Sequence, residues 1–342
     1  MRAAAFALCL LAPLTAVASP WVLPQGKLVV LGRYDYEFAD EEFLDDRKAT
    51  PFSLNGEYSA STYTVGVRLG LTERVELQME LPVKQVSYTA DPVIFFAAPG
   101  EGAQADFDFY QENVIDLSRN KTGLGDLRLS ARYQLIGGSF ASALELGMKT
   151  PTGYDRPMGT FGDRPRSRED FLANVGRYVS PDNVSDDVTL GDGQLDLVPR
   201  ILVGWGAASG FFARADLGYA FRFGGAGDQV VGGVKVGQLL GRQVLIYLGA
   251  EGEIAVTDGD VIGVSVAATD PTLPAAEYSG LDNLYLRELR LERDRLVIPT
   301  GVIFRLMEGA ELNLGYTPVV WGRNTSKVHS FSVGVAMTTP WM

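Results

Sequence analysis

Charged side chains recur at alternate positions in several stretches of the chain, and they have the clearest capacity for chemistry. In KTGLGDLRLSARYQLIGG (121–138), Asp126, Arg128 and Arg132 alternate with apolar residues. A β-strand sends alternate side chains to opposite faces, so one face of this stretch is charged and the other is apolar. Mixed charges on one face can pair with one another, and they can select ions or polar solutes without covalent chemistry.

Polar faces of this kind extend along much of the chain. The candidates on the stretches 124–135, 140–151, 193–205 and 211–223 are Asp126, Arg128, Arg132, Glu145, Lys149, Arg200, Arg214, Asp216 and Arg222. Further members of the set are Glu76, Glu80, Asp196, Lys235, Glu251 and Glu253. A charge that faces lipid near the middle of a bilayer costs about 2–4 kcal/mol, least for the acids. If these stretches cross a membrane, their charged faces therefore line an enclosed interior, the lumen.

The chain has one histidine, His329, and Ser330 follows it directly. A histidine that accepts a proton from a serine hydroxyl could support ester hydrolysis. Adjacent residues on a strand point to opposite faces, however, so these two side chains cannot readily meet. We therefore predict no catalytic residue. We also predict no cofactor, and no metal ligand because the acidic clusters at 40–46 and 258–260 lack the spacing of a calcium loop. An enzyme would need another serine near the histidine and an orienting acid or amide.

The alternation predicts about twelve strands, most of them about 10–15 residues long. The candidates are 27–38, 58–70, 74–88, 124–135, 140–151, 193–205, 211–223, 229–239, 243–256, 284–306, 310–321 and 328–338. Strands of soluble proteins average about 5–6 residues, whereas a tilted strand needs about 9–11 to cross a bilayer. The lengths therefore favour a membrane barrel over a soluble sandwich of sheets.

The connections between these strands alternate between short and long. The short turns are 71–74, 136–139, 206–210, 240–242 and 307–309. The long polar connections include 39–57, 89–123, 152–192 and 257–283. Outer-membrane barrels have tight periplasmic turns, longer external loops and an even number of strands. The predicted fold class is therefore all-β, a single antiparallel transmembrane β-barrel with both termini in the periplasm.

One segment departs from the alternation. In NLYLRELRLERDRLVIP (283–299) the apolar phase slips between Leu286 and Leu289. A short surface helix over 281–293 would fit the sequence nearly as well as a strand. We expect either an external loop helix or a protruding strand that becomes regular near Leu296.

The first residues are typical of a secretory signal peptide. MRAAAFALCLLAPLTAVAS (1–19) has one early basic residue, an apolar run and a small-residue pattern that predicts cleavage after Ala18 or Ser19. Residues 20–342 then form one barrel domain. The only cysteine, Cys9, leaves with the signal, so we expect no disulfide in the mature chain. We expect a monomer in the bacterial outer membrane, inserted by the barrel assembly machinery and in contact with lipid and lipopolysaccharide. The net charge of −12 argues against nucleic acid as a partner.

Three stretches resemble a known family. TGLGDLRLSARYQL (122–135) opens a strand with Gly-x-Gly-Asp. ELGMKTPTGYDR (145–156), followed by LGDGQLDLVPRILVGW (190–205), combines a Pro-Thr-Gly strand end with a Gly-x-Gly strand start. Together they are similar to the outer-membrane barrel family named for the meta-cleavage pathway of phenol degradation. The resemblance implies a transporter of small, often aromatic, compounds, and it implies no individual transport residue.

The function expected from these features is passive passage of small solutes, aromatic or hydrophobic ones among them, through a channel that does no covalent chemistry. Two alternatives stay open. One is an outer-membrane lipolytic enzyme, because outer-membrane phospholipase A is also a twelve-stranded barrel with a serine–histidine arrangement. The other is a structural barrel without flux.

A hydrophobic run lies within the long connection 89–123. It consists of Val93, Ile94, Phe95 and Phe96. A loop surrounded by water has little reason to carry such a run. The run could anchor in the outer leaflet at the barrel rim, or it could fold into the barrel mouth as a hydrophobic constriction. We hypothesise the inward placement, which would make these four residues a gate.

Overall fold

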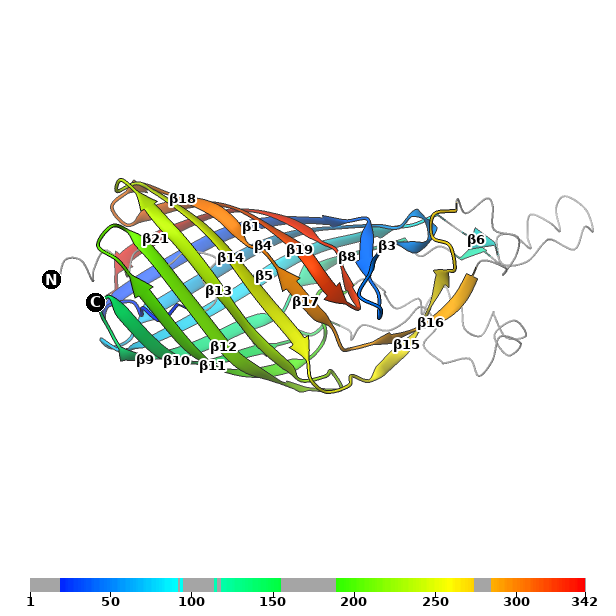
Figure 1. Ribbon diagram of the computed structural model, residues 1–342, viewed down its shortest axis with the longest axis horizontal. Helices are drawn as coiled ribbons and strands as arrows, with labels where there is room; N and C mark the ends of the chain where they lie inside the picture. Colours follow the sequence, from blue (N-terminus) through cyan, green and yellow to red (C-terminus); the bar gives the residue numbers. More distant parts are fainter. Residues whose placement is uncertain are drawn as a thin grey trace, which may run out of the picture.

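The alternating stretches form long antiparallel strands in the computed structural model (Figure 1), which describes residues 19–91, 93–94, 114–115, 118–154, 189–273 and 284–341. Most of the barrel wall consists of uninterrupted strands. They are β1 (Lys27–Ala39), β4 (Glu57–Gly70), β5 (Val75–Thr89), β9 (Leu127–Ile136), β10 (Phe140–Thr150), β11 (Leu195–Gly206), β12 (Phe211–Phe223), β13 (Gln229–Leu240), β14 (Val244–Ala255), β19 (Ala310–Arg323) and β21 (His329–Pro340).

Interrupted strands complete the wall. Strand β8 (Arg119–Leu124) continues the line of β9 along β5, and the break between them lies at Gly125, whose N–H donates to the Pro82 carbonyl. Strands β17 (Asp294–Val297) and β18 (Thr300–Met307) likewise share the position between β14 and β19. The predicted strand 284–306 is therefore divided.

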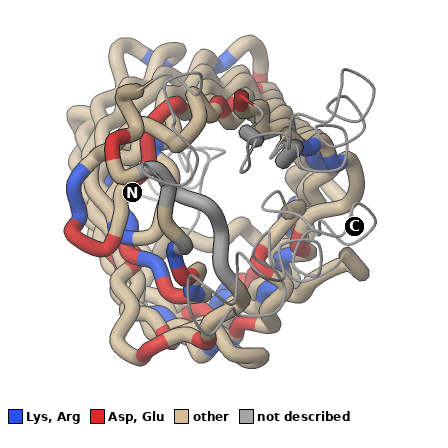
Figure 2. The backbone as a smooth tube through the Cα atoms, turned by 90° about the vertical axis from the view of Figure 1, so that its right-hand side faces the viewer, with Lys and Arg blue, Asp and Glu red and all other residues tan. Residues whose placement is uncertain are grey.

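Each wall strand pairs with the next along the chain, and β1 pairs with β21 to close the ring. The result is a closed antiparallel barrel of 12 strands, which confirms the predicted fold class. The short turns lie at the end of the barrel that also holds both chain termini (Figure 1). We call this the short-turn end and the opposite one the long-loop end. Seen from the long-loop end, acidic and basic positions are interleaved along the ring (Figure 2).

Smaller elements lie beyond the wall at the long-loop end (Figure 1). Strands β2 (Glu41–Phe43), β3 (Ala49–Pro51) and β20 (Thr325–Ser326) form a small sheet next to a 3-10 turn, η1 (Ser53–Asn55). Strands β15 (Val261–Ala268) and β16 (Leu284–Arg290) form a hairpin, and β6 (Val93–Ile94) pairs with β7 (Val114–Ile115). We expected either a loop helix or a protruding strand over 281–293, and β16 confirms the strand. Within the described ranges, no helix is long and apolar enough to cross a membrane.

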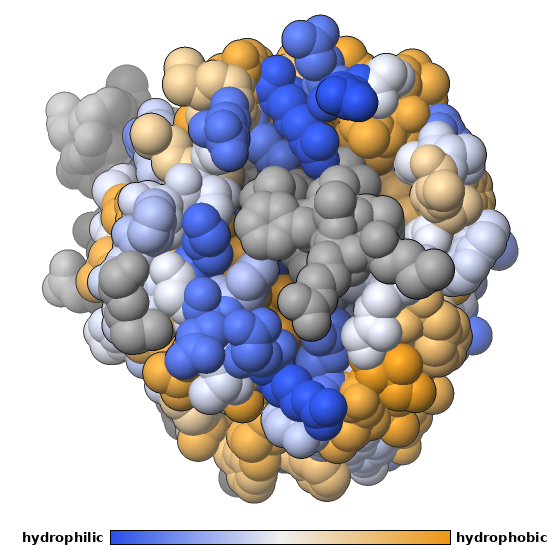
Figure 3. All heavy atoms as spheres, turned by 90° about the vertical axis from the view of Figure 1, so that its left-hand side faces the viewer, coloured by the Kyte–Doolittle hydropathy of each residue, from blue (hydrophilic) through white to orange (hydrophobic). Residues whose placement is uncertain are grey.

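The outer face of the wall is apolar along the whole barrel. Leu217, Val65 and Ile201 are 64%, 61% and 60% exposed. A surface of contiguous exposed apolar side chains is unfavourable in water, whereas lipid accommodates it. Aromatic rings gather near both ends of the strands, as Phe38 with Phe331 and Trp205 with Phe211 show. The short-turn end, viewed directly, has apolar surface around its outside and hydrophilic groups toward its middle (Figure 3).

Candidate functional site

A network of buried ion pairs connects neighbouring strands in the barrel interior near the short-turn end. Arg132 on β9 lies in register with Glu76 on β5 and with Glu145 on β10, and it bonds to both at 3.0 Å. Glu76 also accepts both donors of Arg68 on β4, at 2.9 and 3.0 Å. Arg132 is 2% and Glu76 1% exposed. Four neighbouring strands are therefore cross-linked by charge-assisted hydrogen bonds that water does not reach.

A second network lies nearer the long-loop end. The Lys149 ammonium on β10 contacts Asp192 at 2.6 Å and Asp196 on β11 at 2.7 Å. Arg222 on β12 contacts Asp196 at 3.3 Å and also bonds to Asp192. Burial alone would raise the pKa of Asp192, but Lys149 and neighbouring arginines hold it below its usual value. This carboxylate therefore stays charged and joins the loop before β11 to the wall.

Two different features account for the glycines in the LGDGQ segment, the close approach of side chains to Gly191 and the backbone conformation of Gly193. The Tyr154 hydroxyl donates to Asp126 and accepts from the Gly193 N–H at 3.0 Å. A Cβ on Gly191 would lie 2.1 Å from the Tyr154 hydroxyl oxygen and 2.7 Å from the Asp126 carboxylate, so both side chains would have to shift. Gly193 has a φ of 69°, in the region that favours glycine. These glycines therefore let a tyrosine connect β10, the start of β9 and the start of β11.

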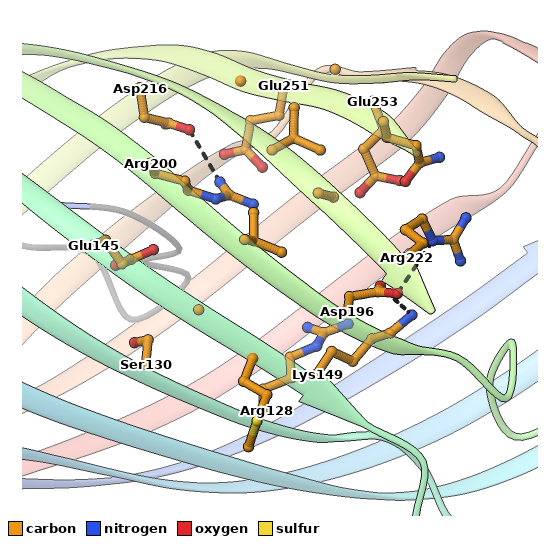
Figure 4. Close-up of a pocket in the computed structure, with 18 of the residues that line it drawn as sticks. Arg128, Ser130, Glu145, Lys149, Asp196, Arg200, Asp216, Arg222, Glu251 and Glu253 are labelled. Carbon is orange, nitrogen blue, oxygen red and sulfur yellow. Dashed lines mark hydrogen bonds and ion pairs between the residues drawn. The ribbon is translucent and has the colours of Figure 1, made fainter. Parts of the chain in front are cut away.

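A cavity of about 290 Å³ lies in the interior between the two networks. Arg128, Lys149 and Arg200 project into it from the neighbouring strands β9, β10 and β11 (Figure 4). Arg200 is paired with Asp216 on β12 at 3.1 Å. Arg128 is exposed to the cavity, and within the described ranges it makes no hydrogen bond or ion pair.

Arg214 on β12 differs from the other interior arginines. It is 6% exposed, and in the described part of the chain no carboxylate pairs with it. Its register partners are Gly204 on β11 and Lys235 on β13, so neither neighbour offers an acid. Lys235 lies 3.3 Å from Glu251 and 5.0 Å from the centre of the Tyr247 ring.

Residues 19–24 lie inside the short-turn end of the barrel, and we call them the strap. The indole N–H of Trp21 donates to the Gly138 carbonyl at 3.0 Å, and the Gln134 amide donates to the Pro20 carbonyl at 3.0 Å. The backbone N–H of Leu23 donates to Glu76 at 2.7 Å. Trp21, Val22 and Leu23 are each at most 5% exposed.

The wall adds apolar side chains of its own at the same end of the interior. Phe212, Leu245, Tyr247 and Ile303 form one buried cluster. A second cluster consists of Leu23 of the strap with Val29, Leu31 and Ala336. The strap and these clusters close this end with apolar and hydrogen-bonded packing. Sequence reasoning missed the strap, because its residues belong to no alternating stretch.

The predicted interior residues all lie on the inner side of the wall, but they fall into different environments. Those in ion pairs are Asp126, Arg132, Glu145, Lys149, Arg200, Asp216 and Arg222. Arg128 is exposed and Arg214 is buried, and the described residues pair with neither. A role for any of them in solute passage stays a prediction.

The predicted gate falls only partly within the described residues. Val93 and Ile94 form β6, which lies beyond the barrel wall at the long-loop end (Figure 1). Phe95 and Phe96 lie outside the described residues, as does the predicted signal peptide up to residue 18. The gate therefore stays a prediction.

His329 lies on the outer face of β21 among aromatic rings. Its Nδ1 is 2.7 Å from the Tyr316 hydroxyl, and its ring stacks on Phe38 at 5.3 Å. Ser330 is in register with Glu37 and Thr317, which belong to the inner faces of β1 and β19. The two side chains therefore point to opposite sides of the wall, as the strand alternation predicts, and the geometry gives no support to a serine–histidine pair at this position.

Comparison with known proteins relates the chain to bacterial outer-membrane barrels. No protein-family model matches the sequence, and no curated protein matches it either. The fold is similar to that of an outer membrane channel from Pseudomonas putida F1, with a TM-score of 0.60 at 10% identity over 96% of this chain and 99% of the other. The translocator domain of the autotransporter NalP from Neisseria meningitidis gives a TM-score of 0.40 at 15% identity, over 92% and 89%. The fold is that of an outer-membrane β-barrel.

Proposed function

We propose that this protein is an outer-membrane channel for the passive passage of small solutes. The observation that carries the proposal is a cavity lined by charged side chains inside a closed barrel whose outer face is apolar. An apolar outer face suits lipid, and a polar interior suits water and solutes. The aromatic solutes implied by the resemblance to the phenol meta-pathway family, a monomeric state and export by a cleaved signal peptide are parts of the same proposal.

In this proposal the strap controls the passage of solutes at the short-turn end. Its backbone continues through residues 25–26 into β1, and hydrogen bonds and apolar packing hold it inside the barrel. Displacing it would connect the cavity to the short-turn end, which would face the periplasm. A hydrophobic constriction hinders ions because their dehydration is costly. In this proposal a docked strap restricts flux and a displaced strap permits it.

The test is single-channel recording of the purified protein in planar bilayers. Trp21→Ala removes the indole and its bond to Gly138, so the mean conductance should rise severalfold. Trp205→Ala is the matched control. It removes the same side chain from the outer face of the same end, where Trp205 is 49% exposed, and should leave the conductance unchanged.

Two results would replace the proposal. If bilayers stay silent even when residues 20–24 are deleted from a correctly folded barrel, the protein is a structural barrel without flux. If the purified protein hydrolyses phospholipid and His329→Ala abolishes the hydrolysis, the protein is a lipolytic enzyme. If Trp21→Ala and Trp205→Ala change the conductance equally, the strap does not control passage.

A further inference from the structure

The cations that line the cavity are not equivalent. Six of the described lining residues are basic, and five of these have carboxylate partners. The pairs are Lys149 with Asp196, Arg200 with Asp216, Arg222 with Asp196, and both Arg293 and Arg295 with Glu253. Arg128 is the remaining one, and it has no such partner in the described ranges.

The register explains why Arg128 forms no ion pair with the described residues. Its neighbours across the strands are Lys149 on β10 and Glu80 on β5. Lys149 repels it and is committed to Asp192 and Asp196. Glu80 is 7% exposed and accepts a hydrogen bond from Gln78 at 2.7 Å. Because Glu80 is buried while Arg128 is exposed, the group presented to a solute on this wall is the cation.

Another part of the cavity lining is apolar. Val198, Ala220, Val231 and Val297 contribute to it from β11, β12, β13 and β17. We call these residues the valine patch. Val198 is half-buried, whereas Ala220, Val231 and Val297 are 4%, 5% and 9% exposed, so only the edges of these three side chains face the cavity. The cavity thus offers a guanidinium that has no ion pair with the described residues, together with a small apolar surface.

We propose that the cavity binds small amphipathic monocarboxylates, with the carboxylate on Arg128 and a single ring or short apolar body against the valine patch. This inference rests on the proposed channel function and names the solute class. A guanidinium presents parallel N–H donors that match the two oxygens of a carboxylate. At about 290 Å³ the cavity is at the lower end of the range for ligand pockets, which suits a one-ring solute.

The test is equilibrium binding to the full-length mature protein in detergent, measured by titration calorimetry with benzoate and with benzamide. The two probes share ring and shape, and benzoate alone carries a charge. We expect the wild type to bind benzoate about tenfold more tightly than benzamide, because a hydrogen bond to a charged group is the stronger one. Arg128→Gln should remove that preference.

Arg200→Gln is the matched control. It removes the same charge from the same cavity, but from an arginine already committed to Asp216. It should therefore retain most of the preference for benzoate. Both variants must migrate differently on gels before and after heating, which shows a folded barrel.

Two results would overturn the inference. One is equal binding of benzoate and benzamide by the wild type. The other is an equal loss of preference in both variants. That result would show that the preference for benzoate arises from the summed electrostatic field of the interior charges and not from Arg128. Binding in detergent requires no flux, so a protein that binds benzoate but leaves bilayers silent would refute the channel and keep the site.

Discussion

Arg132 and Arg128 stand four residues apart on the same face of β9, yet they occupy opposite environments. Arg132 is 2% exposed and bonds to Glu76 and Glu145. Arg128 is exposed to the cavity and has no partner among the described residues. One charged strand face therefore has two different environments along its length. Toward the short-turn end its ion pairs link neighbouring strands, and toward the cavity it leaves a charged side chain exposed.

Arg132→Glu should have the largest effect on stability. The change breaks two buried ion pairs and brings a third carboxylate against Glu76 and Glu145. Breaking a buried pair costs about 3–5 kcal/mol, so we expect failed assembly or a much lower unfolding midpoint. Heat-modifiable gel migration measures assembly, and urea unfolding in detergent measures the unfolding midpoint.

The charge swap Arg132→Glu with Glu145→Arg serves as a control for this prediction. It restores one of the two pairs and should recover part of the stability. A fully stable Arg132→Glu barrel would show that the ion pairs between neighbouring strands do not stabilise the wall, and that Arg132 is no more structural than Arg128.

Arg214→Met separates burial from pairing, because Arg214 is buried like Arg132 and unpaired like Arg128 within the described residues. A desolvated charge without a partner is unfavourable, and replacing it by an apolar side chain of similar length removes that cost. We expect the free energy of unfolding to stay unchanged or to rise by about 1 kcal/mol. A clear decrease in the urea midpoint would instead show that Arg214 stabilises the folded barrel, as Arg132 does.

Arg128→Glu should have the smallest effect on stability, below about 0.5 kcal/mol, because the side chain is exposed and no described residue pairs with it. Its effect should appear in ion selectivity, which we expect to shift toward cations severalfold as the cavity loses its free positive charge. Reversal potentials in a potassium chloride gradient measure this shift. Unchanged ion selectivity in a conducting barrel would show that Arg128, like Arg132, does not influence which ions pass.

The period-two alternation determined much of the fold. It is a local property of each strand, and it placed β1, β10, β12 and β13 to within about two residues. It also assigned the charges of β9 to β12 to the inner face. The contrast between short turns and long connections determined the meander and the common end for both termini. Alternation failed over 284–306, where local irregularity divides the chain into β16, β17 and β18.

Tertiary structure alone decided which inner charges pair and which stay free. Arg128 and Arg132 have the same pattern in sequence, and only the register across β5, β9 and β10 gives one of them two acids and the other a lysine and a buried acid. The strap is a second such case, because residues 19–24 have no periodicity and gain their place from contacts with Gly138, Gln134 and Glu76. Alternation acts between neighbours along one strand, whereas pairing and closure depend on which distant segments the barrel brings together.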